Sequence, residues 1–279
     1  MEGVHTALVT PFSGGGVDLD AYRHLAIRQL DNGVDGLVPC GTTGEMPTLT
    51  RAEWAACIRA AVEVADGAHV TAGIGTNCTA TSVDNAHRAL DLGASKGLLV
   101  LPYYNKPSPR GHKAHVAAVA AVGLPLVLYH VPGRTGQRLP VSLLAELCEL
   151  DGVVAAKEAT GDLRYGSELT ATTSVSVLSG DDFTFFPLIA VGALGVISVV
   201  SNVAPRITTQ LCAAARAGEL DEARELHNRL MPLVEWLFSD TNPAPCKAAM
   251  AAMGLCEDEV RLPLAPVSSP PPELLEGLS

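Results

Sequence analysis

One lysine of this chain lies where an amine could act as a nucleophile. Lys157 falls inside the apolar run VVAAKEA, residues 153–159, where Val153 and Ala155 share its face if the run is a β-strand with period two. Burial disfavours a charged ammonium and supplies the neutral amine that must attack a carbonyl substrate. The alternative is a strand-end lysine that pairs with Glu158 or an aspartate and faces solvent. Among the other four lysines, Lys96, Lys106 and Lys113 fall in predicted turns or at helix starts, and Lys247 follows a Pro-rich helix entry.

Two further side chains lie in or just after the preceding apolar run, PLVLYHV, residues 125–131. Tyr129 can carry protons if it is linked to other hydroxyls such as Thr43 and Tyr104. Arg134 lies in the loop that follows, where a guanidinium can bind a carboxylate through two hydrogen bonds. The simpler alternatives are a tyrosine bonded to backbone and a surface arginine.

Glycines flank a threonine pair after the second apolar run. In GTTGE, residues 41–45, Gly41 and Gly44 allow the backbone at Thr42 and Thr43 to approach a small ligand. The alternative is a tight turn in which a threonine caps a helix.

Signals for metals, nucleotides and phosphate are weak. His112 and His115 have helical spacing, but no carboxylate or cysteine set joins them, so we expect no metal site. Residues 14–16 and 73–75 lack the remaining positions of phosphate-loop and dinucleotide fingerprints, so we expect no cofactor. Many barrel enzymes bind phosphate after strands seven and eight. Asp181 and Asp182 lie at that corner and disfavour a phosphorylated substrate.

Eight short apolar runs alternate with amphipathic stretches, which indicates parallel strands covered by helices. We expect strands at 5–12, 34–40, 69–75, 97–104, 125–131, 153–159, 174–180 and 193–201. We expect the helices near 18–32, 51–66, 81–92, 110–122, 141–149, 162–172 and 183–191. Eight such units favour an α/β fold in which the sheet closes into a TIM (β/α)8 barrel over an open doubly wound sheet.

Helical pattern continues after the eighth strand, at 205–217, 219–239 and 242–254. We therefore predict a barrel over residues 1–217 and a C-terminal helical extension of the same domain over residues 218–279. The candidate chemical residues lie near or just after the ends of predicted strands, and strand ends carry the reacting groups in such barrels.

Composition limits the partners and the compartment. Hydrophobic residues make up 48% of the 279 residues, which is enough for a large core. The net charge of −11 argues against nucleic acid and anionic membrane surfaces. Seven scattered cysteines without a CxxC pair, no readable signal peptide and no apolar run of about 20 residues make the cytoplasm the expected location.

Seven motifs occur in an order that resembles the dihydrodipicolinate synthase / N-acetylneuraminate lyase family. They are GTTGE (41–45), PYYNKP (102–107), YHVPGRTG (129–136), KEATGD (157–162), SGDD (179–182), GVISVVSNVAP (195–205) and NPAPCKAAMAAMG (242–254). Each motif alone is weak, but the ordered set is specific and extends from the first strand to about Gly254.

The double threonine and the Gly-Arg-Thr of residues 133–135 are similar to the family's synthase branch, which condenses pyruvate with L-aspartate 4-semialdehyde in lysine and diaminopimelate biosynthesis. The resemblance implies a Schiff base between Lys157 and pyruvate, without a cofactor. It implies a proton relay through Tyr129, Thr43 and a Tyr104 donated by a neighbouring subunit, in a homo-oligomer that is usually a homotetramer. It also implies substrate binding by Thr42, Thr43, Arg134 and the backbone at Gly180 and Ile197.

The sequence departs from the family at positions that bear on feedback inhibition. Residues 51–54 replace the histidines of lysine-inhibited relatives, and Thr81 replaces an acidic residue, although Asn77 is retained. Met46 stands where a small or polar residue is more common. A pocket without that carboxylate binds an amine poorly, so we predict weak or absent inhibition by lysine.

Two other functions remain open at this point. One is a pyruvate aldolase that acts on a sugar acid of the N-acetylneuraminate or 2-keto-3-deoxygluconate type. Arg134 and the threonine pair favour a short carboxylated aldehyde over a polyol. The other is a non-catalytic barrel that binds a small molecule.

Overall fold

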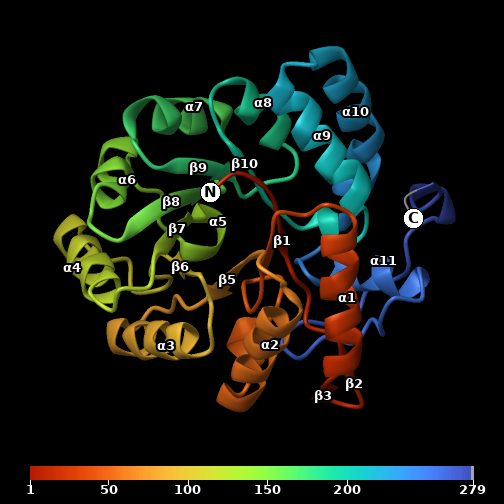
Figure 1. Cartoon of the computed structure of the whole chain (residues 1–279), viewed down its shortest axis with the longest axis horizontal. Coiled ribbons are helices and arrows are strands. Elements are labelled where there is room, and N and C mark those ends of the chain that lie inside the picture. The colour runs from red at the N-terminus through yellow and green to blue at the C-terminus, as the bar shows by residue number, and fades with distance from the viewer. Residues whose placement is uncertain (278–279) are drawn as a thin grey trace.

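Eight parallel strands close into a barrel in the structure, a computed structural model that describes residues 1–277 (Figure 1). The strands are β1 (Gly3–Ala7), β4 (Gly36–Val38), β5 (His69–Gly73), β6 (Lys96–Val100), β7 (Leu126–His130), β8 (Val153–Glu158), β9 (Ser176–Ser179) and β10 (Gly195–Ser198). β1 pairs with both β4 and β10, and this double pairing closes the ring. The predicted TIM barrel is confirmed, and the open sheet is excluded.

Helices follow the strands and surround the barrel (Figure 1). They are α1 (Leu19–Asp31), α2 (Arg51–Val64), α3 (Thr79–Asp91), α4 (Pro109–Ala120), α6 (Val141–Cys148), α7 (Leu163–Thr172), α8 (Phe185–Ala190) and α9 (Pro205–Ala217). Side-chain caps mark several starts: Asp18 accepts from two amides of α1, and Thr50 forms a capping box with Glu53 at α2.

Short elements were not predicted. A small hairpin of β2 (Phe12–Ser13) and β3 (Gly16–Val17) turns through Gly14 and Gly15, both at positive φ. One helical turn, α5 (Pro132–Thr135), follows β7. Three 3-10 turns, η1 (Met46–Thr48), η2 (Val200–Asn202) and η3 (Pro272–Leu274), complete the described chain. Their few residues carry no periodicity that a sequence pattern could detect.

The alternation of β8 separates two apolar cores. Ala155 packs inside the barrel, whereas Ala156 packs in the cluster between the strands and the helices. Lys157 has the parity of Ala155 and therefore projects on the inner face. The prediction that Val153 shares this inner face is wrong. Val153 packs in the outer cluster, because the pairing register with β7 shifts next to it.

The C-terminal helices lie beside the barrel. α10 (Leu220–Leu237) packs against α9, and α11 (Ala244–Ala252) contacts η2 at the end of β10. In Figure 1 this blue segment lies on the side of α1, away from α3 to α7. The predicted boundary at 217/218 stays a prediction. Within residues 1–277, no helix has both the length and the apolar character to span a membrane.

Candidate active site

Lys157 is buried at the mouth of the barrel. Its relative exposure is 5%, and its Nζ lies 4.3 Å from the centroid of the Tyr129 ring. The two residues are register partners on the adjacent strands β7 and β8, which places both side chains on the same inner face. The solvent-facing alternative is therefore excluded. Glu158 projects to the other face, where it accepts from the Thr160 amide at 2.7 Å.

The electrostatics around Lys157 follow from burial. Burial raises the pKa of the Glu158 carboxyl on the outer face. Burial also raises the pKa of Asp181, and the positive charge of Lys157 partly opposes that shift. Across residues 1–277 no carboxylate forms an ion pair with Lys157. The amine of Lys157 is thus held against an aromatic face without a carboxylate partner among the described residues.

A cavity of about 510 Å³ reaches Tyr129 of this pair, whereas Lys157 is not among the residues that line it. Thr42, Tyr129 and Arg134 line it, together with Val100 and Tyr103 from the end of β6. Apolar walls with a few convergent polar groups are typical of small-molecule sites. The structure thereby brings three of the predicted site residues to one cavity.

Two predicted backbone positions lie next to the same pair. Ile197 is fully buried in the interior cluster that contains Tyr129. At Gly180 an added Cβ would lie only 2.7 Å from Lys157 Cε and 2.9 Å from its Cγ. The absence of a side chain at Gly180 therefore leaves room for the lysine.

Asn242 joins two predicted site residues and was not found by sequence reasoning. Its side-chain Nδ2 donates to Thr43 Oγ1 at 2.9 Å, and its backbone carbonyl accepts from Arg134 Nη2 at 3.2 Å. Thr43 is 3% exposed and its hydroxyl is directed at Asn242, while Thr42 lines the cavity. The Asn-Pro that opens the last family motif was the available signal.

Tyr104 stays apart from the other relay residues within one chain. Its side chain is 89% exposed, its backbone has φ +67°, and it forms no hydrogen bond with Thr43 or Tyr129. A non-glycine residue in this region of backbone space is uncommon. The Thr43–Tyr129–Tyr104 relay therefore stays a prediction, and one chain alone does not assemble it.

A buried carboxylate binds two backbone amides at the corner after β9 and β10. Asp182 is 1% exposed, and its Oδ2 accepts from the amides of Val199 and Val200 at 2.9 and 3.0 Å. Burial raises the pKa of this carboxyl. Because the carboxylate already occupies the backbone donors at this corner, these donors are not free to bind a phosphate.

The described residues, 1–277, contain no group of three or more His, Cys, Asp or Glu side chains that could hold a metal ion. The two histidines of α4 have other partners: His112 contacts Gln137 at 3.1 Å, and His115 contacts Thr79 at 2.9 Å. Burial lowers the pKa of both histidines.

One of the other lysines lies elsewhere than expected, and a second is buried more deeply than the sequence indicated. Lys96 begins β6, so Lys157 is not the only lysine in a strand. Lys247 follows the Pro-rich start of α11 as predicted, but it is 0% exposed and pairs with Glu45 at 2.6 Å. The signal for Lys247 was its position in a helix otherwise made of Ala, Pro, Cys and Met.

A closed parallel barrel with a lysine buried beside a tyrosine ring on its inner face is typical of the class of barrel lyases that work through a lysine imine. The model of the dihydrodipicolinate synthetase family matches residues 1–275, and the chain belongs to this family.

Similar proteins agree over nearly the whole chain. A 4-hydroxy-tetrahydrodipicolinate synthase of Pelobacter propionicus is 47% identical, covering 95% of this chain and 93% of that protein. The crystal structure of dihydrodipicolinate synthase from Thermotoga maritima is 42% identical, with a TM-score of 0.95 over 100% of this chain and 97% of that one. A structure described as a monomeric dihydrodipicolinate synthase variant is 41% identical, with a TM-score of 0.95 over 100% of this chain and 95% of that chain.

Proposed function

We propose that this protein is a class I aldolase-type lyase that condenses pyruvate with L-aspartate 4-semialdehyde in lysine and diaminopimelate biosynthesis. The buried Lys157 amine beside the Tyr129 ring is the observation that carries this proposal. Family membership and relatives named 4-hydroxy-tetrahydrodipicolinate synthase support the choice of reaction over sugar-acid cleavage and over a non-catalytic barrel.

The chemistry needs an amine, a proton relay and a place for two carboxylates. The neutral Lys157 amine attacks the keto carbon of pyruvate, and loss of water leaves an iminium. The iminium withdraws electrons, so a methyl proton leaves and an enamine forms. The enamine carbon attacks the aldehyde carbon, and the new alkoxide takes up a proton. The amine of Lys157 performs the role that a cofactor would otherwise fill.

The other predicted residues take roles that fit their positions. Tyr129 would move protons next to the imine nitrogen, and Thr43 would share that task. Thr42 would bind the pyruvate carboxylate, with Thr43 beside it, and Arg134, at the cavity rim, would bind the carboxylate of the aldehyde substrate. Gly180 and Ile197 would line the pyruvate site.

The exposed Tyr104 supports assembly into a homo-oligomer. A neighbouring subunit would cover this ring and insert it into the relay, as in the homotetramer implied by the family resemblance. A monomeric variant among the similar structures means that the family fold does not itself require a tetramer. The cytoplasm is the proposed location, because this biosynthetic reaction uses soluble metabolites.

Borohydride trapping tests the central step. Reduction in the presence of pyruvate should attach one reduced pyruvyl group to Lys157, located by peptide mass spectrometry. Lys157→Met should abolish the adduct, while Lys113→Met, which removes a half-exposed lysine paired with Glu146, should retain it. Purified protein should then consume pyruvate with L-aspartate 4-semialdehyde. An adduct on another lysine, or preferential turnover of a sugar acid, would contradict the proposal.

A further inference from the structure

A buried ion pair connects the C-terminal extension to the threonine loop. Lys247 Nζ of α11 lies 2.6 Å from Glu45 Oε1, and the two side chains are 0% and 2% exposed. The same Nζ donates to the Glu259 carbonyl at 2.7 Å and lies 4.0 Å from the centroid of the Phe12 ring. Neither Lys247 nor Glu45 lines the cavity, and the charged groups of both side chains are bound by other groups of the protein.

Glu45 ends the loop that carries the threonine pair, and its backbone is unusual. Its φ and ψ are 53° and 36°, a left-handed conformation that costs a non-glycine residue free energy and persists only when its surroundings enforce it. The Glu45 amide donates to the Thr42 carbonyl at 3.0 Å, which ties the conformation of Glu45 to the threonine loop.

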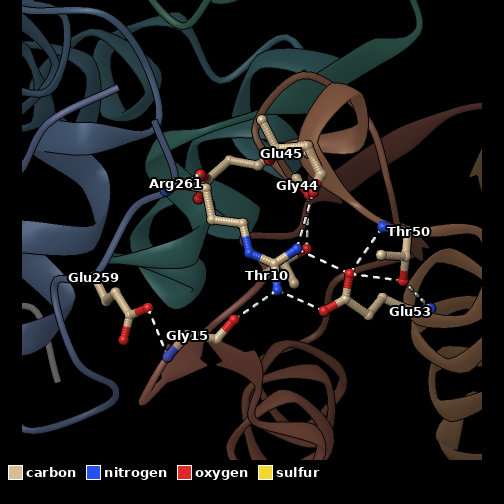
Figure 2. Close-up of polar contacts among 9 residues, drawn as sticks. Thr10, Gly15, Gly44, Glu45, Thr50, Glu53, Glu259 and Arg261 are labelled. Carbon is tan, nitrogen blue, oxygen red and sulfur yellow. Dashed lines mark hydrogen bonds and ion pairs between the residues drawn. The ribbon is translucent and has the colours of Figure 1, made fainter. Parts of the chain in front are cut away.

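Contacts from both sides hold this loop in place. Glu45 Oε2 accepts from the Arg261 amide at 3.0 Å, and Thr10 Oγ1 donates to the Gly44 carbonyl at 2.8 Å. Figure 2 shows Arg261 extending from the C-terminal segment to Glu53 and Gly15, next to the loop that holds Gly44 and Glu45. Both carboxylate oxygens of Glu45 are thus bound by residues of the C-terminal extension.

A buried ion pair of this kind is poorly explained as a source of stability. Removing two charges from water is costly, and an apolar pair of similar volume is often as stable or more so. The pair can instead serve to fix geometry, because two opposite charges in an apolar setting fix the positions of the segments that carry them. Here they fix a loop whose Thr43 lies two residues before Glu45.

We propose that Lys247 is a positioning residue for the reaction: through Glu45 it holds the Thr42–Thr43 loop in the geometry that proton transfer at the Lys157 imine requires. This inference rests on the proposed function. Asn242 Nδ2 donates to Thr43 Oγ1 and occupies one of its lone pairs, so the hydroxyl hydrogen remains free to donate elsewhere. A shift of the loop would disturb this arrangement, whereas Lys157 belongs to β8 and does not contact Lys247.

The two steps can be measured separately. Imine formation is read as the borohydride-trapped pyruvyl group on Lys157. Proton removal is read by NMR as deuterium uptake into the pyruvate methyl group in D2O without aldehyde, since the enamine forms and returns. The exchange rate per trapped imine does not depend on the fraction of protein that is folded.

Lys247→Met should lower the exchange rate per trapped imine by about tenfold or more, because small misplacements of catalytic groups are costly. Lys247→Met/Glu45→Gln removes both charges, so its thermal midpoint should recover relative to Lys247→Met, which leaves Glu45 unpaired. Its exchange per imine should nevertheless stay low. Lys113→Met is the matched control and should behave as wild type.

The outcomes separate this inference from the proposed function. A wild-type exchange per imine in both Lys247 variants would show that the residue serves folding alone. If Lys247→Met does not fold, Glu45→Gln replaces it in the test, because the glutamine keeps an oxygen acceptor for Lys247 but removes the charge. The exchange rate per trapped imine should still fall in Glu45→Gln, and an unchanged rate there would overturn the inference. If wild-type protein forms no adduct at Lys157, the proposed function itself fails.

Discussion

Substituting alanine for Gly180 would test the position of Lys157, because it adds one methyl group beside the lysine side chain. An alanine Cβ there would lie 2.7 Å from Lys157 Cε, 2.9 Å from its Cγ and 2.8 Å from Ala159 Cβ. Carbon atoms in contact normally stay about 3.5 to 4.0 Å apart, so the lysine must move by about 1 Å. Gly180 is not among the glycines with positive φ, so the effect of Gly180→Ala is steric.

Two quantities follow from that displacement. Overpacking of this kind costs about 1–3 kcal/mol of unfolding free energy. A misplacement of about 1 Å at the reacting group lowers kcat/KM by about 100-fold. Steady-state kinetics with pyruvate and the aldehyde, together with the rate of borohydride trapping, would measure the second effect, and chemical denaturation the first.

Gly16→Ala provides the control, because Gly16 also lacks a positive φ and its nearest neighbour is the Ser13 carbonyl at 3.9 Å. It should leave both quantities within error of wild type. If Gly180→Ala traps pyruvate at the wild-type rate with wild-type kcat/KM, then Lys157 does not react from the position described, and the reasoning from its geometry is wrong.

Two further predictions concern inhibition and acid stability. Lysine should inhibit weakly or not at all, because no acidic side chain among residues 1–277 lines the cavity. Arg51 lines the cavity, but it pairs with Asp84. Strong inhibition by low lysine concentrations in the same assay would contradict this prediction. Burial lowers the pKa of His130 from 6.5 to about 4, so the unfolded chain binds the proton first as the pH falls. The contribution of His130 to the free energy of unfolding should therefore be fully present above pH about 6.5. Between pH about 6.5 and about 4 it should fall by about 1.4 kcal/mol per pH unit as the pH is lowered. His130→Leu should reduce the slope measured by urea denaturation across that window by this amount; an unchanged slope would show that His130 does not contribute.

Much of the fold could be predicted because its periodicities are strong and local. Alternation of apolar runs with amphipathic stretches predicted eight strands, the helices between them and a closed parallel barrel, all of which the structure confirms. The predicted strands were longer than the observed ones, since residues at their carboxyl ends enter the loops that carry the polar site. Short elements such as α5 and the hairpin of β2 and β3 were missed, because two to four residues contain no period to recognise.

The candidate site likewise has a part that local sequence pattern could predict and a part that it could not. Strand parity and motif order were sufficient to select Lys157, Tyr129 and Arg134, and the structure places the first two as register partners. Contacts made by residues far apart in the chain were not predictable. Asn242 contacts Thr43 across 199 positions, and Lys247 contacts Glu45 across 202.

By itself, the sequence determined the class of fold, the family and the lysine expected to react, because each depends on local pattern or on an ordered set of motifs. Only the tertiary structure decided that Lys247 is buried and pairs with Glu45, that Asp182 binds two backbone amides after β10, and that Tyr104 stands exposed. These properties depend on which surfaces meet when the chain closes, and burial and pairing across such distances leave no periodic trace in the sequence.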